Sequence, residues 1–177
     1  VEDSYISLVA AIVRFQRVVI CVADDDVETY AEMRLRSNRV DMDRVRFVTV
    51  PYDDTWLRDS GPITLIESGL RDGDDFRLLD FRFTGWGGKY DLPGDDAVAA
   101  FVATTAGVPL ARHDWVLEGG AIDVDGTGLA VTTEQCLLNP NRNPRMDANE
   151  IASHLRRDLG IDRLLWLGDG LEGDHTD

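Results

Sequence analysis

Residues 56–61, WLRDSG, and residues 115–120, WVLEGG, share the pattern W-x-x-[acid]-x-G and begin 59 positions apart in the chain. Each copy places one acidic residue, Asp59 or Glu118, between a tryptophan and a glycine. Residues 166–169, WLGD, form a looser third copy. Recurrence at a fixed period of about 50–60 residues is typical of repeated structural units. The matched stretches therefore predict a fold built from repeats.

The sequence around these stretches predicts an α/β protein in which one order of elements recurs. Apolar periodicity and turn residues indicate helices over 4–15, 27–37, 95–105 and 147–159, and strands over 17–23, 45–50, 62–67, 76–83, 121–124, 128–132 and 163–167. A loop with Gly69 and residues 72–73 joins the strands 62–67 and 76–83. The order strand, acidic loop, hairpin, helix and strand thus occurs twice, and a third copy begins. A closed ring of such units would bring Asp59 and Glu118 together at its centre.

Length and charge limit the classes of partner. The 177 residues, 44% of them hydrophobic, are enough for one well-buried domain over 1–177. No apolar run approaches the ~18 residues of a membrane span, and the first residues lack a signal-peptide pattern. We therefore expect a cytoplasmic protein with no membrane partner. The net charge of −15 disfavours nucleic acid and favours a cationic ligand.

The cysteines do not indicate a disulfide framework or a metal site. Cys21 and Cys136 are far apart in sequence and form no Cys/His cluster. Cys21 lies in the apolar run 18–22, which predicts an inert core thiol with a raised pKa. Residues 123–126, DVDG, resemble part of a calcium loop but lack its later glutamate. The sequence therefore predicts no metal.

The repeated acidic loops suit a planar cation. A guanidinium group presents N–H donors in a fixed fork, from which a carboxylate accepts two in parallel. An indole such as that of Trp56 can stack on the same cation, and the glycines allow close approach of the backbone. Each acid also has a structural interpretation: Asp59 could pair with Arg58 or cap backbone N–H groups, and Glu118 could be a surface turn residue. The match between the two loops favours a binding site.

Four stretches together resemble a known enzyme family. They are residues 56–62 (WLRDSGP), 85–90 (GWGGKY), 117–120 (LEGG) and 132–144 (TTEQCLLNPNRNP). In this order they are similar to the motifs of the agmatine deiminases and bacterial-type peptidyl-arginine deiminases, and the single lysine of the chain, Lys89, lies within one of them. The resemblance implies the pentein fold, an α/β propeller of ββαβ units, with about three of five units present.

The resemblance also implies roles for individual residues. Asp59 matches the aspartate that grips the substrate guanidinium, and Glu118 and Trp56 match positions lining the same pocket. We therefore expect Asp59 and Glu118 as catalytic-site carboxylates, and Trp56, Asp59 and Glu118 as the substrate-binding set. In the family, a cysteine thiolate attacks the guanidinium carbon, ammonia leaves, and water hydrolyses the intermediate with histidine as general acid and base. No metal or organic cofactor is implied.

The chain departs from the family pattern at its end. Residues 174–177, DHTD, resemble the stretch just before the family's G-H-x-D motif, so His175 is not expected to be the catalytic histidine. Cys136 matches a position that is not the nucleophile and is expected to lie away from the carboxylates. We therefore expect residues 1–177 to be a partial catalytic domain that lacks the catalytic histidine and cysteine and is inactive alone.

Three functions remain open. The first is an agmatine deiminase of polyamine metabolism and putrescine biosynthesis, which converts agmatine and water to N-carbamoylputrescine and ammonia. The second is a peptidyl- or free-arginine deiminase. The third is a truncated, non-catalytic guanidinium-binding module. In each case the expected partner is a small cationic guanidino compound, and self-association into a homo-oligomer is left open.

Overall fold

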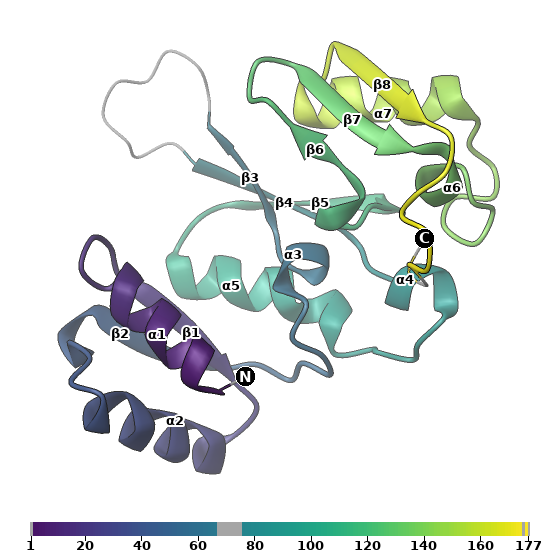
Figure 1. Ribbon diagram of the computed structural model, residues 1–177. Coiled ribbons are helices and arrows are strands. Elements are labelled where there is room, and N and C mark those ends of the chain that lie inside the picture. Colours follow the sequence, from purple (N-terminus) through teal and green to yellow (C-terminus); the bar gives the residue numbers. More distant parts are fainter. Residues whose placement is uncertain (1, 67–75, 175, 177) are drawn as a thin grey trace. The chain divides into compact units, whose positions relative to one another are not determined.

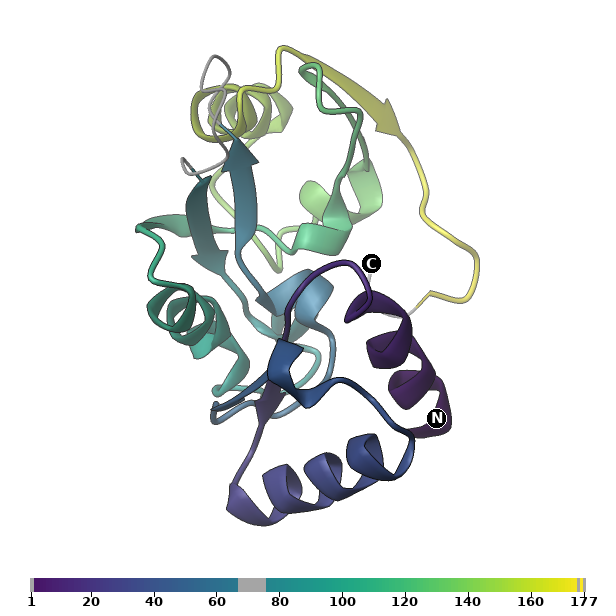
Figure 2. The same cartoon turned by 90° about the vertical axis from the view of Figure 1, so that its left-hand side faces the viewer.

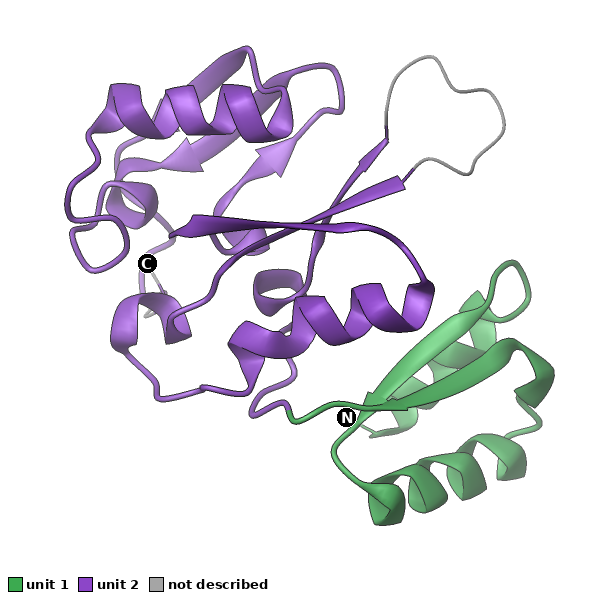
Figure 3. Ribbon diagram, turned by 180° about the vertical axis from the view of Figure 1, so that it is seen from behind, with its two compact units in different colours: residues 1–51 green, residues 52–177 purple. Residues whose placement is uncertain are grey.

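The computed structural model describes residues 2–66, 76–174 and 176 (Figure 1). The predicted loop at Gly69 and residues 72–73, and the terminal His175, lie outside the described residues. The chain divides into two units, residues 1–51 and residues 52–177 (Figure 3). In the part of the chain that is described, no helix is both long and apolar enough to cross a membrane.

The first unit is a parallel strand pair with a helical connection. Its elements are α1 (Glu2–Ile12), β1 (Val18–Val22), α2 (Asp25–Ser37), the short 3-10 helix η1 (Met42–Arg44) and β2 (Val45–Thr49). Strands β1 and β2 pair in parallel, and Val13, Leu35 and Val40 form the buried core of the unit. Helix α2 begins earlier than its predicted start because the Asp24 carboxylate accepts the Val27 N–H at 2.8 Å and caps it.

The first part of the second unit contains one three-stranded sheet. Its elements are α3 (Leu57–Ser60), β3 (Ile63–Ile66), β4 (Phe76–Arg82), α4 (Gly85–Gly88), the short η2 (Asp95–Ala97), α5 (Val98–Ala106) and β5 (Leu110–Val116). Strands β3 and β4 are antiparallel, whereas β4 and β5 are parallel and are connected through α5. Gly107, with a φ of 67°, ends α5 in the left-handed conformation that glycine readily adopts.

The second part repeats this topology. Its elements are η3 (Gly119–Ala121), β6 (Asp123–Val124), β7 (Leu129–Thr133), α6 (Glu134–Leu137), α7 (Ala148–Leu159) and β8 (Arg163–Leu167). Strands β6 and β7 are antiparallel, and β7 pairs in parallel with β8 through the connecting helix α7. Figure 2 views α5 and α7 nearly along their axes, each beside its sheet. The predicted order of strand, acidic loop, hairpin, helix and strand is therefore confirmed in the strand pairing, and the described strands form open sheets.

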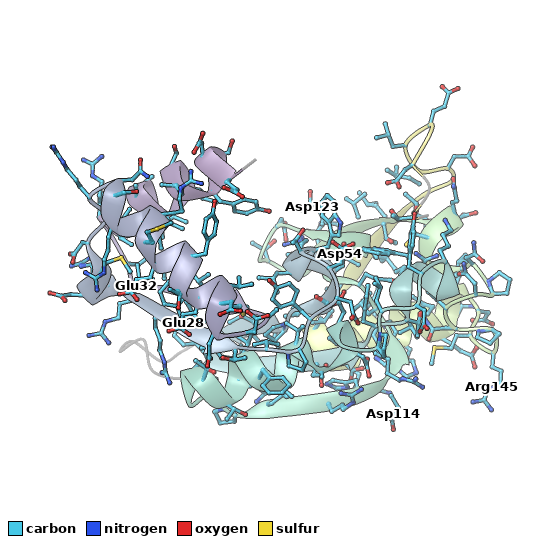
Figure 4. The ribbon with its side chains drawn as sticks, turned by 90° about the horizontal axis from the view of Figure 1, so that it is seen from below. Glu28, Glu32, Asp54, Asp114, Asp123 and Arg145 are labelled. Carbon is cyan, nitrogen blue, oxygen red and sulfur yellow. The ribbon has the colours of Figure 1, made fainter. Side chains whose placement is uncertain are left out.

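Strand β5 is absent from the sequence prediction, which treated Trp115 as part of a loop. The strand reads LARHDWV, and its polar residues hide the apolar pattern. Arg112 and Asp114 are exposed on one face, while Trp115 beyond them is 3% exposed. Figure 4 shows the Asp114 side chain projecting from the ribbon. Alternation of period two was the available signal, but it was interrupted because the polar His113, which stacks on Phe81, lies on the covered face.

One hydrophobic core serves both sheets of the second unit. Its buried residues come from β4, β5, β7, α6, α7 and the segments beside them: Leu79, Phe81, Trp115, Leu117, Ile122, Ala130, Cys136, Leu137, Ile151, Leu155 and Ile161. Because the two sheets share this core, the loops that precede their hairpins are brought side by side. The first of these segments contains the short helix α3, which carries Asp59. The second contains the short helix η3, which directly follows Glu118, and the two helices are in contact.

Replacing Asp147 by alanine is expected to lower the free energy of unfolding by about 1 kcal/mol. The Asp147 carboxylate accepts the N–H groups of Asn149 and Glu150 at 2.8 and 2.9 Å, and the Glu150 carboxylate accepts the Asp147 N–H at 2.8 Å. Urea unfolding followed by circular dichroism measures the change. The exposed Asp114→Ala is the control, and an equal loss in both variants would contradict the capping role.

Candidate active site

The two predicted carboxylates line one cavity in the second unit. The cavity has a volume of about 210 Å³. Its lining residues come from α3, α4, η3 and the residue before it, α6, the loop 139–144 and the last residues of the chain: Asp59, Trp86, Glu118, Gly120, Ala121, Cys136, Arg142, Asp174 and Thr176. The matched acidic loops thus meet at one place, as the repeat predicted for Asp59 and Glu118.

Asp59 is held at this cavity by the neighbouring repeat. The Gly120 N–H donates to Asp59 Oδ1 at 3.0 Å, and the Trp86 indole N–H hydrogen-bonds the same carboxylate. Burial raises the pKa of Asp59, while these two hydrogen bonds and the charge of Arg58 oppose the rise. A Cβ on Gly120 would lie 2.2 Å from Asp59 Oδ1. The glycine of the second motif therefore allows the aspartate of the first motif to approach its backbone.

Glu118 is the most deeply buried acid of the site. Its side chain is 2% exposed, and Arg142 Nε donates to its Oε1 at 3.2 Å. Its other oxygen, Oε2, is buried and has no hydrogen-bond partner among the described residues. Burial raises the pKa of Glu118; the nearby Arg142 lowers it, and the charge of Asp59 raises it further. An unpaired buried carboxylate oxygen on a cavity wall is a ready acceptor for N–H donors.

Arg142 was not among the predicted site residues. Its guanidinium reaches three groups: Glu118, the Asn141 Oδ1 at 3.1 Å, and the backbone carbonyl of Thr176. Its side chain is 1% exposed. Arg142 lies within the stretch 132–144, which resembles a family motif. Nothing in that stretch indicated that Arg142 would be buried and Arg145 exposed.

Trp56 does not line the cavity, contrary to expectation. Trp56 is 59% exposed, and its backbone carbonyl accepts the N–H groups of Asp59 and Ser60 at the start of α3. Trp56 is the N-cap of α3 and has non-helical φ and ψ of −80° and 64°, so its side chain does not follow the helical face that carries Asp59. The aromatic group at the cavity comes from Trp86 instead.

Trp86 is held in an unusual backbone conformation. Its φ and ψ of 56° and 52° lie in the left-handed region, which costs a bulky residue about 1–3 kcal/mol. The residue is 6% exposed and packs edge-on against Phe83 and Tyr90, with ring centroids 5.1 and 5.7 Å away. The neighbouring Gly87 passes so close to Asn141 that a Cβ would lie 2.3 Å from its side chain. This packing holds the indole against Asp59.

The tryptophan of the second motif is a core residue. Trp115 packs edge-on against Phe81, and its indole N–H donates to Asp158 Oδ2 at 3.0 Å. His113 and His154 lie 3.4 and 3.7 Å from the same oxygen. The two motif tryptophans therefore differ in role, although the two motif acids share the cavity.

The predicted location of Cys136 is wrong. Cys136 was expected to lie away from the carboxylates, but it lines the same cavity and is 5% exposed. The local cause is the end of β7 at Thr133, whose hydroxyl accepts the Cys136 N–H at 3.1 Å and caps the start of α6. Cys21 lies in β1 as predicted, but it is only partly buried and is not a core residue as expected; burial still raises the pKa of its thiol.

The arrangement suits a small planar cation. Asp59, Glu118 and Asp174 face the cavity against one arginine, Arg142, whose charge is already matched by Glu118. The charge of Asp174 raises the pKa of Asp59, so the acids repel one another and a bound cation would relieve that repulsion. Among the described residues, no group of three or more His, Cys, Asp or Glu side chains could hold a metal ion.

Known proteins share this sequence and fold. Residues 1–177 match the family model of the Porphyromonas-type peptidyl-arginine deiminases. The agmatine deiminase of Ectopseudomonas mendocina (strain ymp) is 38% identical over 182 residues, which cover 99% of this chain and 47% of that protein. The chain spans about half the length of the curated relatives it matches.

Solved agmatine deiminases have a similar fold. The C. jejuni enzyme with substrate bound is 32% identical with a TM-score of 0.82, and the match covers 99% of this chain and 49% of that one. The Enterococcus faecalis enzyme is 30% identical with a TM-score of 0.81, and the match covers 98% of this chain and 46% of that one.

The pKa of Asp59 is expected to lie above the ordinary aspartate value of about 3.9. The indole ¹H–¹⁵N signal of Trp86, assigned with Trp86→Phe, should therefore shift with a midpoint above that value as the pH is lowered. Since the folded pKa is raised, the proton binds the folded chain more tightly, and this contribution to stability is lost as the pH rises through the folded pKa.

Asp59→Asn should abolish the titration while leaving the indole hydrogen-bonded to the amide oxygen. A midpoint at or below the ordinary aspartate value would show that the hydrogen bonds from Gly120 and Trp86 outweigh burial.

Proposed function

Because the chain belongs to the Porphyromonas-type peptidyl-arginine deiminase family, we propose that it forms the guanidinium-binding part of an agmatine deiminase. The complete protein would convert agmatine and water to N-carbamoylputrescine and ammonia. The curated relatives that are agmatine deiminases support this substrate. The nucleophilic cysteine and the general acid–base histidine would come from outside residues 1–177, and no cofactor is invoked.

One observation carries the proposal: two carboxylates with raised pKa values share a small cavity, and one of them keeps a buried oxygen without a partner. A guanidinium donates parallel N–H groups from a plane, and a carboxylate oxygen on each side can accept them. Asp59 and Glu118 would hold the cation in this way, and Trp86 would supply an apolar wall. Trp56 is exposed in this chain. Its place in the substrate-binding set is supported only by the resemblance of residues 56–62 to the family motif.

The charge of the cavity favours agmatine over arginine. Agmatine and free arginine both carry an ammonium group beside the guanidinium, but arginine carries in addition a carboxylate that must be balanced. The cavity offers the acidic side chains of Asp59, Glu118 and Asp174, and its arginine is already committed to Glu118. A carboxylate on the ligand would meet like charge there, which disfavours it. Peptidyl-arginine, in which that carboxylate is an amide, is the second candidate and is favoured by the family description.

Binding by these residues would prepare the substrate for attack. Fixing the guanidinium plane on two carboxylates leaves its central carbon open to a nucleophile approaching from one face. In the chemistry that the family motifs imply, a thiolate attacks that carbon, ammonia departs, and water then hydrolyses the covalent intermediate. Residues 1–177 would contribute orientation and charge balance, and the reacting groups would come from outside these residues.

The whole fold is proposed to be a pentein-type α/β propeller. The two ββαβ units of residues 52–177 and the β1–α2–β2 unit would account for about three of five repeats. Residues 1–177 would then be a partial catalytic domain. A cytoplasmic location and a small guanidino compound as partner belong to the same proposal.

The chain is expected to bind agmatine without releasing ammonia from it. Isothermal titration calorimetry at neutral pH should detect binding of agmatine, with weaker binding of free arginine. Asp59→Asn should weaken agmatine binding at least about tenfold because it removes one charged acceptor. Asp114→Asn, which changes an exposed acid of β5, is the matched control.

Two results separate the alternatives. Preference for arginine peptides over agmatine would favour a peptidyl-arginine deiminase. Ammonia release by the chain alone would mean that the nucleophile lies within residues 1–177.

Cys136 is expected to react slowly with a thiol reagent in the native chain, because its side chain is buried beside Glu118. Mass spectrometry after pulse labelling with iodoacetamide measures the rate, and the urea-unfolded chain provides the reference. Cys21, which is partly exposed, is the internal control. Rapid labelling of Cys136 that agmatine blocks would make it the candidate nucleophile.

A further inference from the structure

We propose that Arg142 is a positioning residue that occupies one oxygen of Glu118 and thereby dedicates the other oxygen to the ligand guanidinium. The inference rests on the proposed function, since it concerns how the same cavity receives a guanidino compound. It adds a residue that acts through Glu118 and the chain end.

The geometry assigns the two oxygens of Glu118 different tasks. Arg142 Nε donates to Oε1 at 3.2 Å, and both side chains are almost fully buried, at 1% and 2% exposed. Oε2 has no partner among the described residues, yet Glu118 lines the cavity. A carboxylate can accept several donors, so a second guanidinium can bind Oε2 while Arg142 stays on Oε1. Glu118 would then lie between a guanidinium of the protein and one of the ligand.

The charge of Arg142 is needed for this arrangement. A carboxyl group as buried as Glu118 takes up a proton unless an opposite charge lies beside it. Asp59 from α3 and Asp174 from the chain end are the other acids at this cavity, and the charge of Asp59 opposes the ionisation of Glu118. Cys136 from α6 is the remaining titratable group on the wall, and Arg142 is the cation. A protonated Glu118 would lose its attraction for a cationic ligand.

The same guanidinium also fixes the last described residues. Arg142 donates to the carbonyl oxygen of Thr176, and the Asp174 carboxylate accepts the Thr176 N–H and hydroxyl at 2.8 and 2.7 Å. These contacts bring the segment that carries Asp174 to the cavity beside Glu118. Figure 1 shows the chain after β8 returning toward α4 and α6. One buried arginine therefore joins an acid of the repeat motif to the end of the chain.

The test compares Arg142→Gln with Arg142→Lys. Glutamine keeps a hydrogen-bond donor but removes the charge, whereas lysine keeps the charge but not the fork. Arg145→Gln is the control in the same loop region, because Arg145 is exposed and its side chain extends away from the ribbon (Figure 4). Carbon-detected NMR follows the Glu118 side-chain carboxyl, assigned with Glu118→Gln, as the pH of the ligand-free chain is changed.

The expected result has two parts. The Glu118 midpoint moves to higher pH in Arg142→Gln but stays near that of the unaltered chain in Arg142→Lys and Arg145→Gln. Agmatine binding at neutral pH, measured by calorimetry, weakens about tenfold or more in Arg142→Gln, and the loss becomes smaller as the pH is raised. A role in packing or hydrogen bonding alone would give no difference in midpoint between glutamine and lysine.

Two further readouts keep the inference falsifiable. If Arg142→Gln does not fold, the test uses the NMR signal of the Arg142 Nε–H group in the unaltered chain. The chemical shift of this signal should change with the same midpoint as the Glu118 carboxyl, and a shift that does not would overturn the proposal. An unchanged Glu118 midpoint in folded Arg142→Gln would also overturn it. If the unaltered chain binds no agmatine, the proposed function fails, while the ligand-free titration still decides whether Arg142 holds Glu118 ionised.

Discussion

The second unit is organised around a carboxylate that is buried where water cannot solvate it. Glu118 is 2% exposed, and an isolated buried charge is unfavourable by several kcal/mol unless it is paired. Its side-chain partner is Arg142, whose Nε donates to Oε1 at 3.2 Å. The loop 139–144 must therefore fold back over the second motif, and the chain end must come close enough for Arg142 to bind the Thr176 carbonyl. The cavity is what remains between these segments.

The repeated topology explains why two distant acids meet. Each matched loop precedes an antiparallel hairpin, and each hairpin is followed by a helix and a parallel strand. A shared core fixes the two sheets, so the loops at their starts are neighbours. The hydrogen bond from Gly120 to Asp59 is the direct link between the repeats. A Cβ on the matched glycines would lie 2.5 Å from Leu57 O at Gly61 and 2.2 Å from Asp59 Oδ1 at Gly120.

Features that suit the cavity for a cation oppose stability. Burial raises the pKa values of Asp59 and Glu118, so keeping both ionised at neutral pH has a free-energy cost. Trp86 adds left-handed backbone strain, and Glu118 Oε2 is left without a donor. The common core of the two sheets offsets these terms. A cationic ligand would satisfy the free oxygen and reduce the repulsion between the acids, so binding and stability are coupled through the same groups.

The sequence by itself determined the α/β order, the repeat and the two acids. Hydrophobic periodicity, glycine and proline set helices, strands and turns through local interactions, and a repeated motif can be recognised without knowing any tertiary contact. Helix α7 and strand β8 were predicted closely for this reason. Strand β5 was missed because the polar His113 interrupts its covered face. Only the tertiary structure decided that Trp86 replaces Trp56 at the cavity, that Cys136 lies beside the acids, and that Arg142 is buried whereas Arg145 is exposed. Those outcomes depend on which distant loops pack together, and a residue's identity does not specify its partner across space.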